Sequence, residues 1–386
     1  TMQRKPDRIL YFSSFGNLRW GGQKSLFHLV TGLDRLAFRP SVVVPSEGGL
    51  ARQLEEKGVE VCVIALPQVS PKRILRDLSA LRLLLNVIDD RKIDLLHSDG
   101  PRNTLYAGLA ARLRGLPLVW HARAMDADPY DRILCRLATR VVLVADALRD
   151  RYNGICNAEK LVTIHNGVDL DVFSGTSGVA WRESVPIPTG RLIIASAGRI
   201  EPMKGQETLI AAGGTLRKAG ADFHILLAGE TVDSSYERVC RQKAAELDIS
   251  DRVTFMGHQD DMASVLKAID IFVLPSAVRE AFPRSVIEAM ACGKPVIVTS
   301  GGGAPEALED GRSGFVVPPS DPSTLSERLI RLAGDAALRK AMGASARHRA
   351  EELFSLERNV RKTQDLYRTL LTGRKNAGRC VQSVRT

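Results

Sequence analysis

The sequence lacks the marks of cysteine-rich, metal-binding and membrane-spanning proteins. Its 386 residues include six scattered cysteines, none of them in a C-x-x-C pair, which favours reduced thiols over a metal site or a disulfide framework. No apolar run approaches the roughly 18 uninterrupted residues of a membrane span, and the N-terminus lacks the apolar region of a signal peptide. We therefore expect a cytoplasmic protein.

Aromatic residues are also scarce, at 5% of the chain, and there is neither a zinc-finger spacing nor an aromatic-rich RNA-binding motif. These absences argue against nucleic acid as a partner. The formal net charge is nevertheless +10. A positive excess of this kind favours an anionic partner of another class, either an acidic lipid or a phosphorylated small molecule.

A basic segment, Pro71–Arg76, leads into a helical pattern with an apolar stripe made of Leu78, Leu81, Leu85 and Ile88. Such a helix can lie on an anionic membrane, which would place the protein at the inner face of the cell membrane as a peripheral protein. The favoured interpretation is that the stripe faces the core of a domain and the charges face water.

Strands and helices alternate through both halves of the chain, which predicts parallel sheets. In the first half we expect strands at 8–12, 41–44, 61–65, 95–97, 118–121, 141–144 and 161–164. In the second half we expect them at 192–195, 223–227, 253–255, 271–274, 296–298 and 315–317. Each half opens with a strand, a glycine-containing loop and a helix. The pattern therefore predicts an α/β fold of two doubly wound, Rossmann-like domains that face a central cleft and bind ligands at their strand C-termini.

The composition also predicts the domain boundaries. Residues 171–190 contain GTSG and VPIPTG, whose Gly, Pro, Ser and Thr are typical of a linker. We therefore expect an N-terminal domain at 1–170 and a C-terminal domain at 191–355. The remaining segment, 356–386, reads as a helix and a basic tail.

Two cations, Arg199 and Lys204, follow the first strand of the second half in the loop AGRIEPMKG. A guanidinium fork and a compact ammonium group together suit a diphosphate. The alternative is that they are two surface cations, since Lys and Arg are common. Their place after a strand and between glycines favours the diphosphate.

The segment REAFPRSVIEAMACGKPVI, residues 279–297, places one acid before a helix and another inside it. The spacing predicts a helix over 284–291 that begins after Pro283 and ends at Gly293. Its first-turn N–H groups favour phosphate, and Glu280 and Glu288 can accept hydrogen bonds from sugar hydroxyls. A phosphate site flanked by two such acids indicates a nucleotide sugar. The alternative is one solvated acid and one that pairs with a neighbouring cation.

At this point the motifs resemble those of glycosyltransferase family 4, the retaining enzymes of the GT-B fold. The Glu-x7-Glu motif EAFPRSVIE and the following AMACGKPVIVTSGGGAPE are similar to the family pattern, as are AGRIEPMKG, RVTFMGHQDDM, IFVLPS and IHNGVD in the same order. WGGQKSL at 20–26 and VWHAR at 119–123 resemble its motifs in the first half more loosely. Pro283 stands where many members have glycine, and Val144-Ala145-Asp146 departs from the usual serine-containing strand end.

The resemblance implies a role for each matching residue. The residues implied in catalysis are Arg199 and Lys204 on the diphosphate, Glu280 on the transferred sugar, and His121 near the reacting sugar. The residues implied in nucleotide-sugar binding are Gly21, Gly22, Gly257, His258, Phe282, Pro283, Arg284, Ser285 and Glu288, with Glu288 on the ribose and Gly257 and His258 near the base. The first domain would then bind the acceptor, and the last helix would cross back onto it.

The resemblance also implies the reaction. A sugar would move from a nucleotide-diphosphate sugar, such as a UDP- or GDP-sugar, to an acceptor hydroxyl with retained anomeric configuration. We expect neither a metal nor a cofactor, because Arg199 and Lys204 supply the positive charge. Asp126, Asp128, Asp169 and Asp171 form two Asp-x-Asp pairs that we interpret as loop acids.

The acceptor is the part of the reaction that the sequence describes least. Arg102, Asn103, Arg123 and Tyr130 lie in loops that are expected to face it, although surface roles are equally compatible. The basic first half favours a lipid-linked or phosphorylated acceptor, as in cell-surface polysaccharide or glycolipid assembly. The expected partner is therefore a carbohydrate or lipid-linked acceptor. A nucleotide-sugar 2-epimerase, a sugar phosphorylase and a non-catalytic nucleotide-sugar-binding protein are the alternatives.

Overall fold

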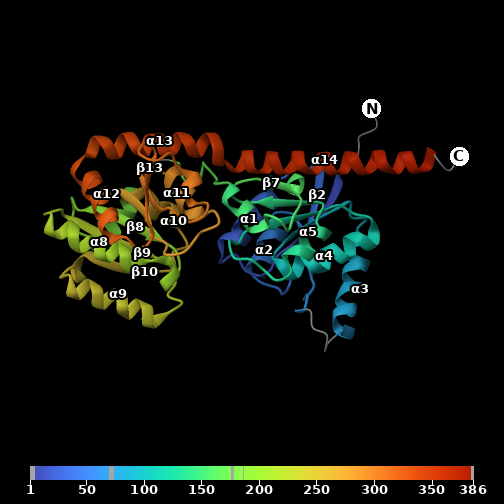
Figure 1. The fold of residues 1–386 in the computed structure, drawn as a ribbon, viewed down its shortest axis with the longest axis horizontal. Coiled ribbons are helices and arrows are strands. Elements are labelled where there is room, and N and C mark those ends of the chain that lie inside the picture. The colour runs from blue at the N-terminus through green and yellow to red at the C-terminus, as the bar shows by residue number, and fades with distance from the viewer. Residues whose placement is uncertain (1–4, 69–73, 175–177, 186, 384–386) are drawn as a thin grey trace. The chain divides into compact units, whose positions relative to one another are not determined.

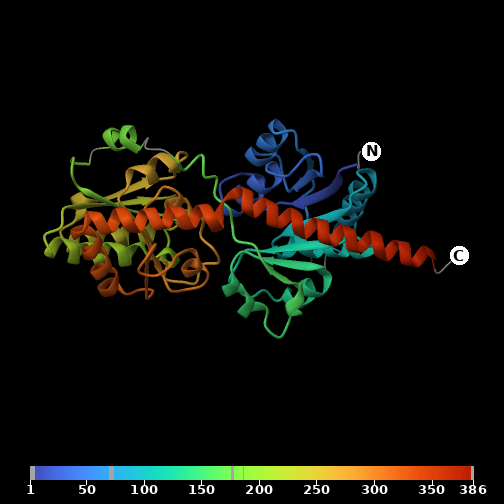
Figure 2. The same cartoon turned by 90° about the horizontal axis from the view of Figure 1, so that it is seen from above.

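The computed structural model describes residues 5–68, 74–174, 178–185 and 187–383 (Figures 1 and 2). Contacts between residues divide it into two compact units. The first unit comprises Thr1–Gly167 together with Leu356–Thr386, and the second comprises Val168–Ser355. The segment expected to be a linker, 171–190, contains helix α7 (Gly178–Ser184), which packs against α10 (Met262–Ala268) within the second unit.

The first unit is built on a seven-stranded parallel sheet with the order β3-β2-β1-β4-β5-β6-β7. Its strands are β1 (Asp7–Phe12), β2 (Phe38–Val44), β3 (Glu60–Val63), β4 (Leu95–Asp99), β5 (Leu118–Ala122), β6 (Arg140–Leu143) and β7 (Leu161–Thr163). Every strand expected in this half is present, and the differences are confined to strand ends. Central strand β1 is apolar throughout its buried part because the sheet is covered on both faces.

Two groups of helices enclose this sheet. They are α1 (Gly21–Thr31), α2 (Gly49–Glu56), α3 (Ile74–Asp90), α4 (Pro101–Arg114), α5 (Asp131–Leu137), α6 (Arg149–Tyr152) and the last helix, α14 (Leu356–Ser383). Helix α14, drawn in red in Figure 1, buries Val360, Tyr367 and Leu371 in the same core cluster as residues of α1, β1 and β2. The last helix is therefore an integral part of the first unit.

Helix α3 confirms the favoured interpretation of the apolar stripe over only part of its length. Leu84 and Ile88 are buried in the core, and Leu81 and Leu85 pack against it. Near the helix start, however, Leu78 is 55% exposed and Leu75 is 80% exposed. The basic residues at 71–73 lie outside the described residues. The stripe therefore faces the core from Leu81 onward and is exposed at Leu78.

The second unit is built on a six-stranded parallel sheet with the order β10-β9-β8-β11-β12-β13. Its strands are β8 (Leu192–Ala197), β9 (Phe223–Ala228), β10 (Val253–Gly257), β11 (Ile271–Leu274), β12 (Val296–Thr299) and β13 (Gly314–Val317). Its further helices are α8 (Gln206–Lys218), α9 (Ser234–Glu246), α11 (Arg284–Ala291), α12 (Pro322–Gly334) and α13 (Ala336–Phe354). The prediction of two doubly wound parallel-sheet domains is confirmed, as are the bounds of the helix after Pro283.

The strand order places a binding position in each sheet. In the first, β1 lies between β2 and β4, and in the second, β8 lies between β9 and β11. At such a point the two neighbouring strands are connected in opposite directions, and the loops that leave their carboxyl ends diverge. Ligands of doubly wound proteins bind there, so the loops after β1 and β4, and after β8 and β11, are the first places to look for a site.

Candidate functional site

In the second unit, the loops after β8 and β11 bring together a cation and an acid. Lys204 ends a short 3-10 turn, Pro202–Lys204, and its Nζ lies 2.5 Å from Oε1 of Glu280. The same carboxylate oxygen accepts a hydrogen bond from Oγ of Ser276 at 2.7 Å. The side chains of Lys204 and Glu280 are 19% and 16% exposed. The pair is therefore well shielded from water but still reachable.

Two glycines allow these loops to come so close. Gly205 has φ +64°, and a Cβ added to it would lie 2.0 Å from the carbonyl oxygen of Pro275. Gly302 has φ +73°, and its Cβ would lie 2.1 Å from the carbonyl oxygen of Glu280. Both positions require glycine, for conformation and for space. One holds the Lys204 loop against β11, and the other holds the Glu280 segment against the loop after β12.

Arg199 lies in the same loop as Lys204. Its guanidinium group pairs with Glu201 at 2.8 Å, and its side chain is 40% exposed. Its backbone carbonyl accepts a hydrogen bond from the amide of Gln206 at 2.8 Å, which ties the loop to the start of α8. The structure thus places Arg199 in the same loop as Lys204, with Glu201 as its acidic neighbour.

Helix α11 begins beside this pair without a side-chain cap. Pro283 is its N-cap residue and makes no side-chain cap hydrogen bond. The first-turn N–H groups and the positive end of the helix dipole favour an anion. Phe282 is buried and packs against Phe354 with ring centroids 5.3 Å apart, which anchors the approach to the helix. Ser285 lies in the first turn, half-buried.

Glu288 follows one turn later and is paired within its own helix. Its Oε1 lies 3.1 Å from the guanidinium of Arg284, and the two side chains are 14% and 10% exposed. The alternative interpretation of the two acids was that one of them pairs with a neighbouring cation, and Glu288 does so. A role on a ribose would therefore have to be shared with this ion pair, and it stays a prediction.

Gly257 and His258 lie farther along the same sheet edge. They follow β10, the edge strand, which β9 separates from β8. Gly257 has φ +68°, and its carbonyl accepts from the N–H of Gly229 at 2.8 Å. His258 is exposed, with its Nε2 3.3 Å from Asp260. Among the described residues no contact joins them to Lys204 or Glu280, so their place near a base stays a prediction.

In the first unit, His121 lies near the carboxyl end of β5 and is buried with His97 of β4. Its Nδ1 is 3.2 Å from Nε2 of His97 and 3.2 Å from a guanidinium nitrogen of Arg123. Burial, followed by the charge of Arg123, lowers the pKa of His121 well below its ordinary value, and the same two causes lower that of His97 to about 3. Both rings are therefore neutral at physiological pH.

The glycine pair lies at the start of α1. Gly21 is the first residue of the helix, and Trp20 is its N-cap without a side-chain cap. A Cβ added to Gly22 would meet only the side chain of Arg123, at an ordinary 3.8 Å. Packing inside the first unit therefore does not require glycine at position 22.

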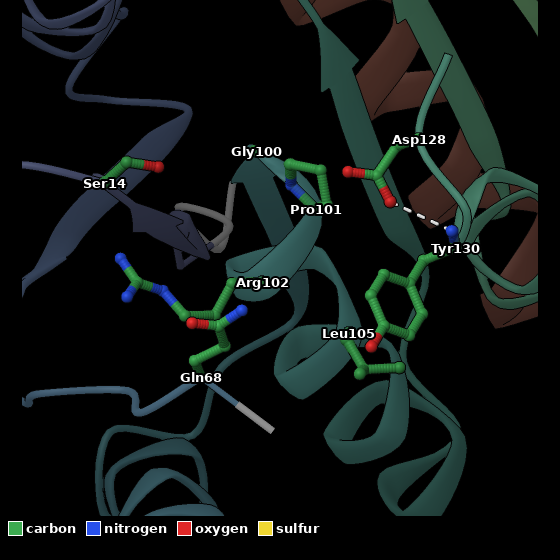
Figure 3. Close-up of a pocket in the computed structure, with 8 residues that line it drawn as sticks. All are labelled: Ser14, Gln68, Gly100, Pro101, Arg102, Leu105, Asp128 and Tyr130. Carbon is green, nitrogen blue, oxygen red and sulfur yellow. Dashed lines mark hydrogen bonds between the residues drawn. The ribbon is translucent and has the colours of Figure 1, made fainter. Parts of the chain in front are cut away.

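A pocket of about 320 Å³ opens at the switch point of the first sheet (Figure 3). Its lining residues come from the loops after β1, β3, β4 and β5 and from the start of α4, and they are Ser14, Gln68, Gly100, Pro101, Arg102, Leu105, Asp128 and Tyr130. Figure 3 shows the guanidinium of Arg102 on the side of Ser14 and Gln68, and the ring of Tyr130 beside Leu105. The pocket therefore combines a charged side with an apolar side.

The four candidate acceptor residues are distributed over this region unequally. Arg102 and Tyr130 line the pocket. The expectation that Arg102 and Asn103 lie in a loop is wrong, because both belong to the first turn of α4. Asn103 is 5% exposed, and its amide donates to Oγ of Ser14 at 3.2 Å and to Asp99 at 3.4 Å, so it supports the pocket wall from behind. Arg123 contacts His121 and, at 3.0 Å, Oδ1 of Asn166.

A buried ion pair fixes the loop after β5. Arg151 donates to both carboxylate oxygens of Asp131, at 2.8 and 2.7 Å, and to the carbonyl of Ala124 at 2.6 Å. Asp131 in turn accepts from the N–H of Asp128 at 3.0 Å. The loop that presents Asp128 and Tyr130 to the pocket is thereby held at both ends.

The sequence motifs do not single out Ser276, Ser14, Gln68 or Asp128 as site residues. Ser276 lies in the segment IFVLPS, and Ser14 lies in the loop directly after β1, so the rule that ligands bind after the strands could have found both. Gln68 follows a short edge strand, β3, that carries no such signal. Within the described residues, no group of three or more His, Cys, Asp or Glu side chains is arranged to hold a metal ion.

The chain matches two family models. The model for glycosyl transferases group 1 matches residues 179–349, and the model for glycosyltransferase family 4 matches residues 21–172. A D-inositol 3-phosphate glycosyltransferase from Saccharomonospora viridis is 32% identical over 304 residues, which cover 71% of this chain and 70% of that protein. One from Mycolicibacterium smegmatis is 35% identical over 224 residues, covering 55% and 49%. The chain thus spans between about half and 70% of these relatives' lengths.

Solved structures show the same fold at lower sequence identity. A glycosyltransferase from Rickettsia africae aligns with a TM-score of 0.86 at 22% identity, covering 95% of this chain and 99% of that one. The Anabaena protein HepE in complex with UDP and glucose aligns with a TM-score of 0.80 at 21% identity, covering 93% and 98%.

Proposed function

Because the chain belongs to glycosyltransferase family 4 and has the GT-B fold, we propose that it transfers a sugar from a nucleotide-diphosphate sugar to an acceptor hydroxyl with retention of configuration. The observation that carries the proposal is the shielded contact between Lys204 and Glu280 at the switch point of the second sheet. It sets a cation for a leaving diphosphate beside an acid for sugar hydroxyls.

The reaction develops negative charge on the departing diphosphate and positive charge on the sugar ring. Lys204 and Arg199 stabilise the first, and the N–H groups at the start of α11 contribute to the same effect. Glu280 orients the sugar through its hydroxyls while it also accepts from Ser276. Because these groups are held in place before the reaction, little reorganisation accompanies it. The departing phosphate takes the acceptor proton in a front-face reaction.

The nucleotide is the first point to test. Structures of HepE contain UDP and UDP-glucose, which makes uridine donors the first choice and GDP-sugars the second. A ligand that binds only the native state raises the melting temperature. At a ligand concentration of about a hundred times Kd, it adds about 2.7 kcal/mol to the free energy of unfolding. We expect one nucleoside diphosphate of the panel to raise the melting temperature clearly more than the others.

The configuration of the product tests the reaction itself. With the matching donor and an accepted acceptor, NMR of the product is expected to show the anomeric configuration of the donor. Inversion would refute retention. Epimerisation of the donor without any acceptor would identify a 2-epimerase, and binding without turnover over many acceptors would identify a nucleotide-sugar-binding protein.

We propose that the acceptor binds in the pocket of the first unit and carries an anionic group. Arg102 lines it at the N-terminus of α4, and the named relatives act on D-inositol 3-phosphate. A carbohydrate or lipid-linked acceptor of cell-surface polysaccharide or glycolipid assembly fits this chemistry. Arg102→Ala is expected to raise KM for a phosphorylated acceptor and leave KM for the donor unchanged, whereas Arg112→Ala, at the far end of α4, changes neither.

Peripheral contact with an anionic membrane is proposed for the first turn of α3. Leu75 and Leu78 are exposed there, and Arg76 lies between them. None of the helices in the described part of the chain combines the length and hydropathy that a bilayer span needs. Leu75→Asp is expected to reduce co-sedimentation with vesicles containing phosphatidylserine. The matched control is Leu36→Asp, at an equally exposed leucine elsewhere in the first unit; equal losses in both variants would contradict the contact.

We further propose that transfer needs no metal. The positive charges that stabilise the leaving diphosphate, Lys204 and Arg199, belong to the protein. Activity is therefore expected to survive EDTA. A complete loss that magnesium or manganese restores would refute metal independence.

A further inference from the structure

A chain of buried polar side chains runs through the first unit from the last helix to His121. Oη of Tyr11 lies 2.8 Å from Oη of Tyr367 on α14, and Tyr367 is hydrogen-bonded to Nδ1 of His97. Nε2 of His97 lies 3.2 Å from Nδ1 of His121. All four side chains are at most 3% exposed, so each needs a defined hydrogen-bond partner.

Arg123 determines the direction of these hydrogen bonds. A guanidinium group only donates, and one of its nitrogens lies 3.2 Å from Nδ1 of His121. Nδ1 must therefore be the acceptor. Because the buried ring is neutral, its proton is on Nε2. Nε2 of His121 is buried and has no hydrogen-bond partner among the described residues.

The assignment then propagates back along the chain. Since Nδ1 of His121 accepts, Nε2 of His97 must donate to it, and Nδ1 of His97 is left as an acceptor. Tyr367 donates to that nitrogen. The oxygen of Tyr367 then accepts from the hydroxyl of Tyr11. Each member has one role, and the direction runs from Tyr11 to His121.

We propose that Arg123 sets the tautomer of His121, that Tyr367 and His97 are positioning residues that hold its ring, and that His121 acts as a hydrogen-bond donor through Nε2. The proposal rests on the sugar transfer proposed above. A histidine protonated on Nε2 cannot accept a proton there, so His121 is not a general base. It donates to an oxygen of the reacting substrates near the carboxyl end of β5.

The assignment explains two otherwise unrelated features. The first is the presence of a histidine on each of the neighbouring strands β4 and β5. In the strand register His121 is paired with Asp99, and His97 lies two residues before Asp99. The second is a tyrosine hydroxyl on α14 that is fully buried under the sheet. An apolar residue at 367 would fill the same core without a polar group. The hydroxyl of Tyr367 supplies the donor that Nδ1 of His97 needs.

Nitrogen NMR of the full-length chain labelled with ¹⁵N-histidine reads both tautomers directly. The chain has seven histidines, and the variants His121→Gln and His97→Gln assign the two signals. The expected spectrum shows His97 and His121 each protonated on Nε2 and unprotonated on Nδ1. A proton on Nδ1 of His121 would overturn the proposal. This measurement does not depend on any activity, so it tests the tautomers of His97 and His121 even if no sugar transfer is found.

Two matched pairs of variants test the positioning roles. Tyr367→Phe removes a hydroxyl that is hydrogen-bonded to Tyr11 and His97. Tyr152→Phe removes a buried hydroxyl that has no hydrogen-bond partner among the described residues. We expect Tyr367→Phe to put the His97 proton in exchange between both nitrogens and to lower kcat about fivefold to tenfold, with KM for the donor unchanged. Tyr152→Phe is expected to change neither. Equal effects in the two variants would overturn the role of Tyr367.

The second pair changes His97. A glutamine can still donate to Nδ1 of His121 and accept from Tyr367, whereas a methionine of similar size can do neither. His97→Gln is expected to keep most of kcat, and His97→Met to lose about tenfold. Equal kcat in the two variants would show that His97 only fills space.

Discussion

At the scale of single residues, the partner of each charged group sets what it can do. Glu280 accepts from both Lys204 and Ser276, which holds its carboxylate in one place. Arg199, in the same loop as Lys204, has Glu201 as its acidic neighbour and is more exposed. We infer that Lys204 is the main stabiliser of a leaving diphosphate and that Arg199 contributes less.

Lys204→Ala is expected to lower kcat about 10²–10³-fold, which is the effect of removing one preorganised charge stabiliser. Steady-state kinetics with the matched donor measure it. The control is Lys243→Ala, a partly exposed lysine on α9 that is 3.9 Å from Glu207. A rate for Lys204→Ala near that of the control would remove Lys204 from the mechanism.

His97 makes the stability of the first unit depend on pH. Its pKa is about 3 in the folded protein against an ordinary 6.5, chiefly because of burial. Between these values the unfolded chain binds a proton that the folded chain does not. The contribution of His97 to the free energy of unfolding is therefore fully present above about pH 6.5 and is lost progressively as the pH is lowered. Burial also lowers the pKa of His121, so the contribution of His121 to the free energy of unfolding likewise falls as the pH is lowered.

His97→Gln is therefore expected to flatten the fall in the free energy of unfolding between pH 6.5 and 5. One proton corresponds to at most about 1.4 kcal/mol per pH unit. Urea unfolding of both proteins at several pH values provides the comparison. The control is His348→Gln, at an exposed histidine. If the slope of His97→Gln equals that of the wild-type protein, the role given to His97 is contradicted.

At the scale of elements, the loops after the strands act as rigid parts because glycines let them pack closely. Gly205 sits directly after Lys204 and adopts φ +64° against the carbonyl of Pro275. The loop position of Lys204 is therefore set by backbone contact with the segment that carries Ser276. Helix α11 adds its uncapped first turn at the same edge.

Gly205→Ala is expected to destabilise the second unit and to reduce activity, because a left-handed alanine costs about 1–2 kcal/mol and its Cβ would also overlap Pro275. Gly220 has φ +79° but nothing within 4 Å of an added Cβ, so Gly220→Ala carries the conformational cost alone. Thermal unfolding measures the loss of stability in each variant, and kcat measures the loss of activity. Equal destabilisation by both substitutions would mean that the close approach is absent in solution.

At the scale of the whole molecule, each of the two units has its own buried core, and only the first is assembled from segments that are distant in the sequence. Helix α14, from the end of the chain, completes one of the core clusters of the first unit, whereas the core of the second unit lies wholly within Val168–Ser355. Units with separate cores unfold as separate cooperative transitions unless they are strongly coupled.

Leu329→Ala and Leu371→Ala test this division. Leu329 is fully buried in the second core and Leu371 in the first, and each truncation costs about 2–5 kcal/mol. Calorimetry is expected to show that each variant lowers a different transition. The matching nucleoside diphosphate should raise the transition that Leu329→Ala lowers. A single transition lowered equally by both variants would contradict two independent cores.

The strands, the bounds of α11 and the doubly wound pattern of both halves are predictable from the amino-acid sequence alone. These features follow from local periodicity, from Pro283 at a helix start and from Gly293 after its end, all of which lie within a few residues of the element they define. The loops that carry Lys204 and Glu280 were found for the same reason.

Which of these groups come into contact cannot be predicted in this way. The contact of Lys204 with Glu280, the pairing of Glu288 with Arg284, and the place of Tyr367 beside His97 depend on strand order and on side-chain conformation. Hydrophobic periodicity contains neither, because it reports which face of an element is buried and not which other element covers it.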